Sequence, residues 1–302
     1  NAVDSVKYEY FGKTAHAAGS PEHGRSALDA IELMNIGVNF LREHVVQEAR
    51  IHYVIEEGGG QPNVVPDYAR SWYYIRAPER SMVAHIAGRI NKIAKGAAMM
   101  TDTELKIDLI AAIYNKIPNR VLSELVTANM REVGHPGWTK EEETFASEIA
   151  KTLDPDAKIA GLKKYGVPNP EKYKDVNLMT DIHDAWNDGY VSKGSTDVSD
   201  VSWQCPTMEF STSCNVLGAP GHDWRFTAVS GMSIGHKSLV FAAKTMAASA
   251  LDLFTKPEVI KKAWEEQEKR IGGREYICPI PEDVNPPLAI AEEAWQKLKG
   301  KR

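Results

Sequence analysis

Four residues of this sequence are candidates for a catalytic or binding role in a polar reaction: His16, Asn63, Arg76 and His222. His16 and His222 carry imidazoles, which can donate a hydrogen bond or bind a metal such as zinc. The planar guanidinium of Arg76 matches a planar carboxylate, and the amide of Asn63 could contact a substrate. Each also has a structural interpretation, because Asn63 and His222 stand in Gly- and Pro-flanked turns and His16 and Arg76 adjoin or lie in strands. Residue type alone leaves both interpretations open.

The segments around these residues resemble a known family. The relevant motifs are Gly12-Lys13-Thr14-Ala15-His16-Ala17-Ala18, Gln61-Pro62-Asn63-Val64-Val65-Pro66 and Tyr73-Tyr74-Ile75-Arg76. In residues and separations they are similar to the lid, or dimerisation, domain of the zinc aminoacylase and carboxypeptidase family, and most similar to the B type of its aminobenzoyl-glutamate utilization group. Gly218-Ala219-Pro220-Gly221-His222-Asp223-Trp224 resembles the segment that carries the family's last metal ligand.

The resemblance implies a metal-dependent amidohydrolase acting on an acyl- or aroyl-amino acid such as p-aminobenzoyl-glutamate. Metal-bound water would be the nucleophile, and a Glu outside this chain the base. His16 would reach across a dimer and donate to the oxyanion in the partner's active site. Asn63 would contact the substrate, Arg76 would hold its carboxylate, and His222 would bind zinc or manganese. A family loop that normally carries Glu-Asp-Phe resembles Gly194–Trp203, but Thr196 replaces the Glu. We therefore expect Asp197 and Asp200 either to orient a metal ligand or to have a structural role such as capping a helix.

The metal site that the resemblance implies is incomplete in this sequence. A catalytic zinc site needs about three protein ligands, and the family takes most of them from a His-x-Asp or Cys-x-His stretch and from a paired-Glu segment. Neither stretch occurs here. The paired acids stand in other contexts, and the last three pairs suggest solvated helical faces: Glu56-Glu57, Glu141–Glu143, Glu265-Glu266 and Glu292-Glu293. We therefore expect the chain alone to be inactive.

Composition excludes other classes of function. A net charge of −5 and a pI of about 6.0 give no electrostatic basis for nucleic-acid binding. Cys205, Cys214 and Cys278 are widely spaced without a C-x-x-C motif, which favours a reducing, cytoplasmic location. No apolar run approaches the ~18 residues that a membrane span needs.

The pattern of the first 115 residues predicts a ferredoxin-like β-α-β-β-α-β domain. Strands are expected at Lys7–Lys13, Ile51–Glu56, Tyr68–Ala77 and Leu105–Tyr114. Apolar residues spaced by three and four predict two helices. The first helix carries Ala27, Ile31, Met34, Val38 and Leu41 on one face, and the second carries Met82, Ile86, Ile90 and Ile93.

Residues 116–302 are expected to form the C-terminal part of a zinc-exopeptidase-like α/β catalytic domain, giving an α/β (α+β) chain overall. Helices are predicted over Pro118–Val133 and His236–Phe254, and Thr139 with Glu142 predicts a capping box. Thr255–Glu258 should cap a further helix that ends at Gly272-Gly273, and Met208–Thr212 should be a strand. Residues 154–196 allow no assignment.

Two interpretations of function follow, and both include a homodimer through the lid. One is the amidohydrolase described above, with a small-molecule substrate, no nucleic acid and no membrane. The alternative is a non-catalytic dimerisation or scaffold subunit, or one that completes the site of a partner subunit. A transferase or binding module on a ferredoxin-like fold rests on fold alone.

Overall fold

The computed structural model describes residues 1–154, 156–184 and 190–282, and five separate positions after these (284, 288, 295, 296 and 299). The chain forms two compact units. The first comprises Asn1–Lys116, Lys193–Asp200 and Tyr276–Arg302, and the second comprises Ile117–Ser192 and Val201–Glu275. The acidic pair Glu292-Glu293 lies outside the described residues.

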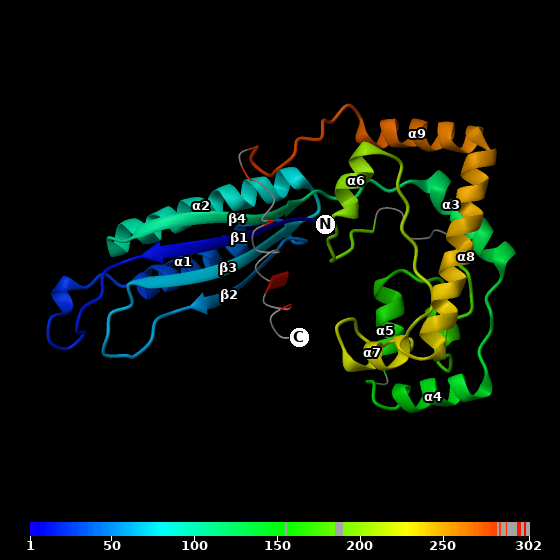
Figure 1. Ribbon diagram of the computed structural model, residues 1–302, viewed down its shortest axis with the longest axis horizontal. Helices are drawn as coiled ribbons and strands as arrows, with labels where there is room; N and C mark the ends of the chain where they lie inside the picture. Colours follow the sequence, from blue (N-terminus) through cyan, green and yellow to red (C-terminus); the bar gives the residue numbers. More distant parts are fainter. Residues whose placement is uncertain are drawn as a thin grey trace. The chain divides into compact units, whose positions relative to one another are not determined.

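The first unit is a four-stranded antiparallel sheet with two helices (Figure 1). Its strands are β1 (Ala2–Phe11), β2 (Arg50–Glu57), β3 (Tyr68–Ala77) and β4 (Glu104–Ile113), in the order β2-β3-β1-β4. The helices α1 (Ala27–Leu41) and α2 (Arg80–Thr101) follow β1 and β3 along the chain. This element order confirms the predicted ferredoxin-like β-α-β-β-α-β fold of the first unit, which is called the lid below after the resemblance given above.

The core of this unit lies between the helices and one face of the sheet. All five residues of the predicted α1 stripe are buried, from Ala27 to Leu41. From the sheet, Tyr8 and Tyr73 are fully buried with their rings edge to face, 5.4 Å apart between centroids. The Tyr8 hydroxyl donates to Asn91 of α2 at 2.7 Å, so the buried phenol keeps a hydrogen-bond partner. The unit therefore buries the apolar face of its sheet with its own helices.

The second unit is helical in the part of the chain that the structure describes. It contains α3 (Arg120–Val133), α4 (Lys140–Ala150), α5 (Ala157–Lys164), α7 (Trp224–Ser230), α8 (Ser233–Thr255) and α9 (Pro257–Ile271), while α6 (Val198–Gln204) crosses the boundary between the units. Short 3-10 turns are η1 (Pro21–His23) and η2 (Arg42–His44) in the first unit and η3 (Pro170–Tyr173) in the second. Sequence patterns allowed no assignment for the region that holds α5 and η3.

Local signals placed most helix ends correctly. The capping box of Thr139 and Glu142 at the start of α4 is confirmed, and Gly134 and Gly272 end α3 and α9 with positive φ. The predicted cap at Thr255 is wrong. Thr255 is the last residue of α8, and its hydroxyl donates to the Leu251 carbonyl at 2.8 Å, so Lys256 occupies the N-cap of α9 instead.

The prediction of a strand at Met208–Thr212 is also wrong, because no residue of this segment is in a strand. A strand exists only with a hydrogen-bonded neighbour, and the second unit offers no other strand among its described residues. Thr212 instead contacts α8, where its hydroxyl donates to the Ser238 carbonyl at 3.2 Å.

Candidate functional site

His16 and Asn63 lie side by side at one end of the lid, in the loops that follow β1 and precede β3. The Ala17 N–H donates to the Asn63 carbonyl at 3.0 Å, and His16 forms an isolated antiparallel bridge with Val64. These contacts extend the β1–β3 pairing into the loops. Both side chains are exposed, so they are available to a group outside this domain.

The imidazole of His16 is held by its own loop. Its Nδ1 accepts hydrogen bonds from the backbone N–H groups of Ala18, at 3.2 Å, and Gly19, at 3.0 Å. Since Nδ1 acts as an acceptor, the proton of the neutral ring sits on Nε2. His16 therefore presents an oriented Nε2–H donor to its surroundings.

Arg76 lies at the opposite end of the same sheet. It pairs with Val3 of β1 and Arg50 of β2, whereas β3 begins on the side of Asn63 at Tyr68. Eight residues of strand at about 3.3 Å each place Arg76 roughly 26 Å from the beginning of β3. The structure thus brings together two of the three lid residues, His16 and Asn63, and separates Arg76 from them.

The guanidinium of Arg76 is half-buried and has local partners. It donates to the Ser195 hydroxyl at 3.2 Å and lies over the Tyr74 ring at 5.4 Å. Ser195 belongs to Lys193–Asp200, the later segment that packs with the first unit. Neither the Tyr74 ring nor the neutral Ser195 hydroxyl neutralises the charge of Arg76. Its guanidinium therefore has N–H donors left to bind an anion such as a carboxylate.

His222 lies in the second unit in a strained backbone conformation. Its φ of 58° is in the left-handed region, which non-glycine residues adopt only at a cost of roughly 1 kcal/mol or more. The ring is exposed. The neighbouring Asp223 is committed, since its carboxylate caps α7 at the Arg225 N–H (2.9 Å) and pairs with the Arg225 guanidinium (2.8 Å). His222 is thus presented in a loop whose nearest acid already has partners.

The loop Gly194–Trp203 has a structural role at Asp200. The Asp200 carboxylate accepts from the Tyr114 N–H at 3.3 Å and from the Tyr276 hydroxyl at 3.1 Å. Burial raises the pKa of Asp200 above its usual value, although these hydrogen bonds act in the opposite direction. The Thr196 hydroxyl accepts from the Val198 N–H at 3.3 Å at the start of α6. The contacts of Asp200 are structural, because they join the segments around Tyr114, Asp200 and Tyr276 within the first unit.

Two of the acids that the sequence suggested were solvated are in fact buried or bonded. Glu142 is buried and accepts from the Ser233 hydroxyl (2.6 Å), Lys237 (2.7 Å) and the Thr139 N–H (2.7 Å). Glu266 of α9 accepts from the N–H groups of Arg120 and Val121, both at 2.9 Å, and so caps α3. The expectation of a solvated face failed at both residues because Ser233, Lys237 and the start of α3 are remote in sequence. The contact of Glu142 with Thr139 is the capping box that the sequence predicted.

The described residues contain no group of three or more His, Cys, Asp or Glu side chains that could hold a metal ion. Of the paired acids, Glu56 bonds Lys7 and Arg70 on the sheet, at 3.0 and 2.8 Å. His222 therefore belongs to no such group in the part of the chain that the structure describes. The donor set does not fit a catalytic zinc or manganese centre.

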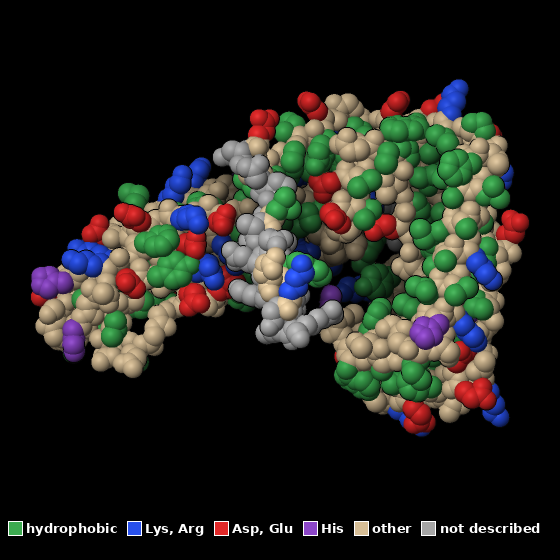
Figure 2. All heavy atoms as spheres, viewed as in Figure 1, with side chains coloured by type: hydrophobic (Ala, Val, Ile, Leu, Met, Phe, Trp, Pro, Cys, Tyr) green, Lys and Arg blue, Asp and Glu red, His purple; other side chains and the backbone are tan. Residues whose placement is uncertain are grey.

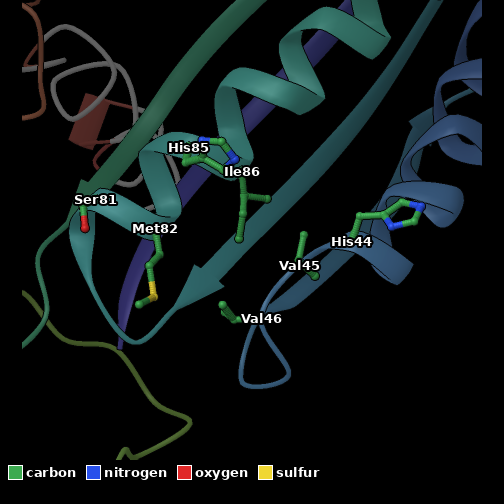
Figure 3. Close-up of a pocket in the computed structure, with 7 residues that line it drawn as sticks. All are labelled: His44, Val45, Val46, Ser81, Met82, His85 and Ile86. Carbon is green, nitrogen blue, oxygen red and sulfur yellow. The ribbon is translucent and has the colours of Figure 1, made fainter.

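A cavity of about 510 Å³ opens on the helical side of the lid (Figure 3). It is lined by His44, Val45, Val46, Ser81, Met82, His85 and Ile86. These residues follow α1 and begin α2, and hence lie toward the Arg76 end of the domain. The cavity does not include His16 or Asn63.

Sequence reasoning missed the groups that orient the candidate residues. The backbone N–H groups of Ala18 and Gly19 fix His16, and Ser195 contacts Arg76. The run of small residues after His16 is a signal that could have suggested the first contact. Nothing local points to Ser195, because it lies far from Arg76 along the chain.

Comparisons with known proteins relate this chain to a family of peptidases. A family model described as the peptidase dimerisation domain of the M20 family matches residues 3–99. The B subunit of p-aminobenzoyl-glutamate hydrolase from Escherichia coli K12 is 37% identical over 289 residues, which cover 93% of this chain and 60% of that protein. The Xaa-Arg dipeptidase of Mus musculus is 27% identical over 285 residues, covering 93% of this chain and 53% of the relative. The chain thus spans little more than half the length of these relatives.

Among solved structures, an aminobenzoyl-glutamate utilization protein from Klebsiella pneumoniae is similar over 44% of this chain and 34% of that one, with 24% identity and a TM-score of 0.40. The sequence comparisons carry the assignment. This chain carries an M20 peptidase dimerisation domain at residues 3–99, within a sequence related over most of its length to the B subunit of p-aminobenzoyl-glutamate hydrolase.

Proposed function

We propose that this chain supplies the lid and part of the catalytic domain of a metal-dependent amidohydrolase. Its substrate class is the acyl- or aroyl-amino acids, with p-aminobenzoyl-glutamate as the leading member. The observation that carries the proposal is the oriented Nε2–H donor of His16 beside Asn63 at an exposed end of the lid. The 37% identity to a p-aminobenzoyl-glutamate hydrolase subunit supports the reaction and substrate class.

His16 acts as the donor to the carbonyl oxygen of the scissile amide. Negative charge grows on that oxygen when water adds to the carbonyl, and a donor already held in place stabilises it without reorganisation. The two N–H groups that bind Nδ1 provide this preorganisation. Loss of one such donor costs about 3 kcal/mol of transition-state stabilisation. Asn63 lies alongside to contact the same substrate.

Arg76 binds the substrate carboxylate, but not in the site that His16 of its own chain serves. The roughly 26 Å of strand between the two ends of the sheet exceed the length of a small acyl-amino acid. A two-fold dimer resolves this, since each site then receives His16 and Asn63 from one protomer and Arg76 from the other. The separation of His16 and Arg76 along the sheet therefore favours the role of His16 in the active site of the partner protomer.

The lid dimer forms through β2 and α1. Ile36 and Phe40 are exposed on one face of α1, and Val54 and Ile55 are exposed on the edge strand β2. The other edge strand, β4, exposes charges at alternating positions (Glu104, Lys106 and Asp108), which oppose pairing between edges. The apolar edge is the one suited to an isologous contact.

Zinc or manganese would polarise the substrate carbonyl and activate water in the complete enzyme. Of the described residues only His222 is proposed as a ligand, so the other ligands and the general base have to come from elsewhere. The same observation favours one alternative, in which this chain is a non-catalytic dimerisation or scaffold subunit. Three unpaired cysteines suit the reducing cytoplasm that we propose as its location.

Metal content and activity of the purified chain test the assignment of metal ligands. We expect no cleavage of p-aminobenzoyl-glutamate and no stoichiometric zinc or manganese. Metal-dependent cleavage by this chain alone would contradict the assignment of ligands. The decisive experiment uses a fusion of the chain to the part of the E. coli hydrolase subunit that it does not match.

In that fusion, His16→Ala should lower kcat by about 10²-fold with little change in KM, because the donor acts mainly in the transition state. His23→Ala is the matched control, since His23 is an exposed imidazole in the same loop. Mixed dimers of His16→Ala and His222→Ala protomers should regain activity. If mixed dimers form and stay inactive, His16 does not act across the dimer. A fusion that binds metal and substrate but never cleaves the amide favours the scaffold.

A further inference from the structure

A further cavity, of about 500 Å³, lies in the second unit between the end of α3 and the first half of α8. Its titratable side chains are two imidazoles and two ammonium groups: His135, His236, Lys237 and Lys244. No Asp or Glu among the described residues lines it. The volume is in the range of small-molecule sites, and this set of side chains favours a ligand that carries negative charge.

The imidazole of His135 is fixed as a hydrogen-bond donor. Its Nδ1 accepts from the Gly137 N–H at 3.0 Å. Burial, assisted by the nearby charge of Lys237, lowers the pKa of His135, so the ring is neutral at neutral pH and its proton sits on Nε2. The rings of Trp138 and Phe241 contact it edge to face, at 4.7 and 5.6 Å between centroids, which restricts its orientation.

The two lysines make the cavity positively charged. Lys237 donates to the Glu142 carboxylate at 2.7 Å and to the Gly137 carbonyl at 3.3 Å, so its charge is balanced while one of its three N–H groups is left. Lys244 lies about two turns further along α8 and is exposed. Because Glu142 is already paired with Lys237, the ammonium of Lys244 gives the cavity its net charge.

The remaining walls are apolar, with Phe241 only 4% exposed at the base and Val240 50% exposed at the rim. Figure 2 shows histidine and Lys or Arg side chains among apolar ones where Figure 1 places the first half of α8. A strongly hydrated ion such as phosphate would gain nothing from these walls. A flat aromatic ring would cover them and could pack edge to face on Phe241, as His135 does.

A metal ion is a poor match for this cavity. Two imidazoles line it, but the residues that the structure describes include no group of three or more His, Cys, Asp or Glu side chains that could hold a metal. The ammonium groups of Lys237 and Lys244 would also repel a cation. An anion with an apolar body satisfies both the charge and the walls.

We propose that the cavity between α3 and α8 binds a small aromatic carboxylate of about the size of benzoate. The carboxylate accepts hydrogen bonds from the Nε2–H of His135 and from the ammonium of Lys244, and the ring packs against Phe241 and Val240. The proposal concerns binding by the second unit and does not depend on the reaction proposed above.

The test is a nuclear magnetic resonance titration of the isotope-labelled chain with sodium benzoate at neutral pH and constant ionic strength. The amide signals of Gly134 and Gly137 should shift and saturate with a Kd of about 1 mM or tighter, as expected for so small a ligand. Lys244→Gln should weaken binding by about fivefold or more, because a charge-assisted hydrogen bond is lost. Lys262→Gln is the matched control, since Lys262 is an exposed lysine of α9 that does not line the cavity.

His135→Phe should weaken binding to a similar extent, because it keeps an aromatic ring and removes the donor. Circular dichroism verifies the fold of each variant. If His135→Phe does not fold, Lys244→Gln decides the question alone, since this side chain is exposed.

Two further probes test the chemistry of the ligand. Benzamide, which has the ring without the charge, should bind about tenfold more weakly than benzoate, and inorganic phosphate should not displace benzoate. The proposal is overturned if benzoate causes no saturable shift by about 10 mM, or if Lys244→Gln binds it as tightly as Lys262→Gln. Equal binding of benzamide would reduce the cavity to an apolar groove. Displacement of benzoate by equimolar phosphate would assign the cavity to an inorganic anion instead.

Discussion

The two units of this chain differ in what their helices bury. In the first, α1 and α2 place apolar stripes against one face of their own sheet, and Tyr8, Ile31 and Tyr73 are fully buried between them. In the second, α8 is the longest helix described, and it directs Ser238 and Thr245 inward and leaves Phe254 outside. A domain needs two layers around one core. Among the residues that the structure describes, the first unit shows both layers and the second shows helices alone.

The largest effect is expected in the core of the first unit. Ile31→Ala should lower the free energy of unfolding by about 3 to 4 kcal/mol, because it removes a fully buried side chain and leaves a cavity. Ile36→Ala, on the exposed face of the same helix, should change it by less than about 0.5 kcal/mol. Urea unfolding followed by circular dichroism measures both. Equal effects would mean that α1 does not pack as described.

The second unit should depend instead on its buried ion pair. Glu142→Gln should cost roughly 3 kcal/mol, because Lys237 loses its charge partner and the capping box is weakened. Glu141→Gln, at the exposed neighbouring position, is the matched control and should cost much less, since this carboxylate contacts only the start of α4. Urea unfolding of the two variants at neutral pH provides the comparison.

Glu142 should also make the stability of the protein depend on pH in the acid range. Burial acts to raise the pKa of Glu142, but hydrogen bonds from Lys237, Ser233 and the Thr139 N–H prevail and lower it to about 2. A carboxyl whose pKa is depressed in the folded state stabilises the protein above its unfolded value of 4.5, and that contribution disappears as pH falls toward 2. Glu142→Gln should flatten the loss of stability over this window. A wild-type curve that is equally flat would contradict the pairing.

The dimer prediction compares the two edges of the lid sheet. Val54→Asp on β2 should weaken the homodimer by about tenfold or more, because it places a charge in an apolar contact. Ile110→Asp makes the same kind of change on the exposed face of β4 and should have little effect. Light scattering over a concentration series measures both. If Ile110→Asp weakens the dimer and Val54→Asp does not, the interface lies at β4. If the unchanged chain is a monomer at high micromolar concentration, the dimer prediction is wrong.

The smallest effect is expected on the outside of α8. Phe254→Ala should change the unfolding free energy of the chain by less than about 0.5 kcal/mol, since its side chain is exposed. Phe241→Ala, on the buried face of the same helix, should cost about 3 kcal/mol. Thermal unfolding of both variants verifies this difference. A large loss for Phe254→Ala would mean that this side chain packs against another part of the chain.

Sequence patterns predicted the helices and strands of the lid well because the signals for them lie within each segment's own residues. The spacing from Ala27 to Leu41 is the buried stripe of α1, and β3 spans the predicted Tyr68–Ala77. The patterns failed where an element needs a distant partner. Met208–Thr212 has strand-forming residues but no neighbouring strand among the residues that the structure describes, and Glu266 belongs to a charged helical run but caps α3 from more than a hundred residues away.

The sequence by itself determined the lid topology, the helix ends at Gly134 and Gly272, and the motifs around His16, Asn63 and Arg76, because periodicity, capping and turn chemistry act over a few residues. Only the tertiary structure decided which of these residues meet. The strands set His16 and Asn63 together and hold Arg76 at the far end, and the polar contacts of Ser238 and Thr245 on one face of α8 leave Phe254 exposed on the other. Distances and exposure of this kind arise from contacts between remote segments, which local patterns do not encode.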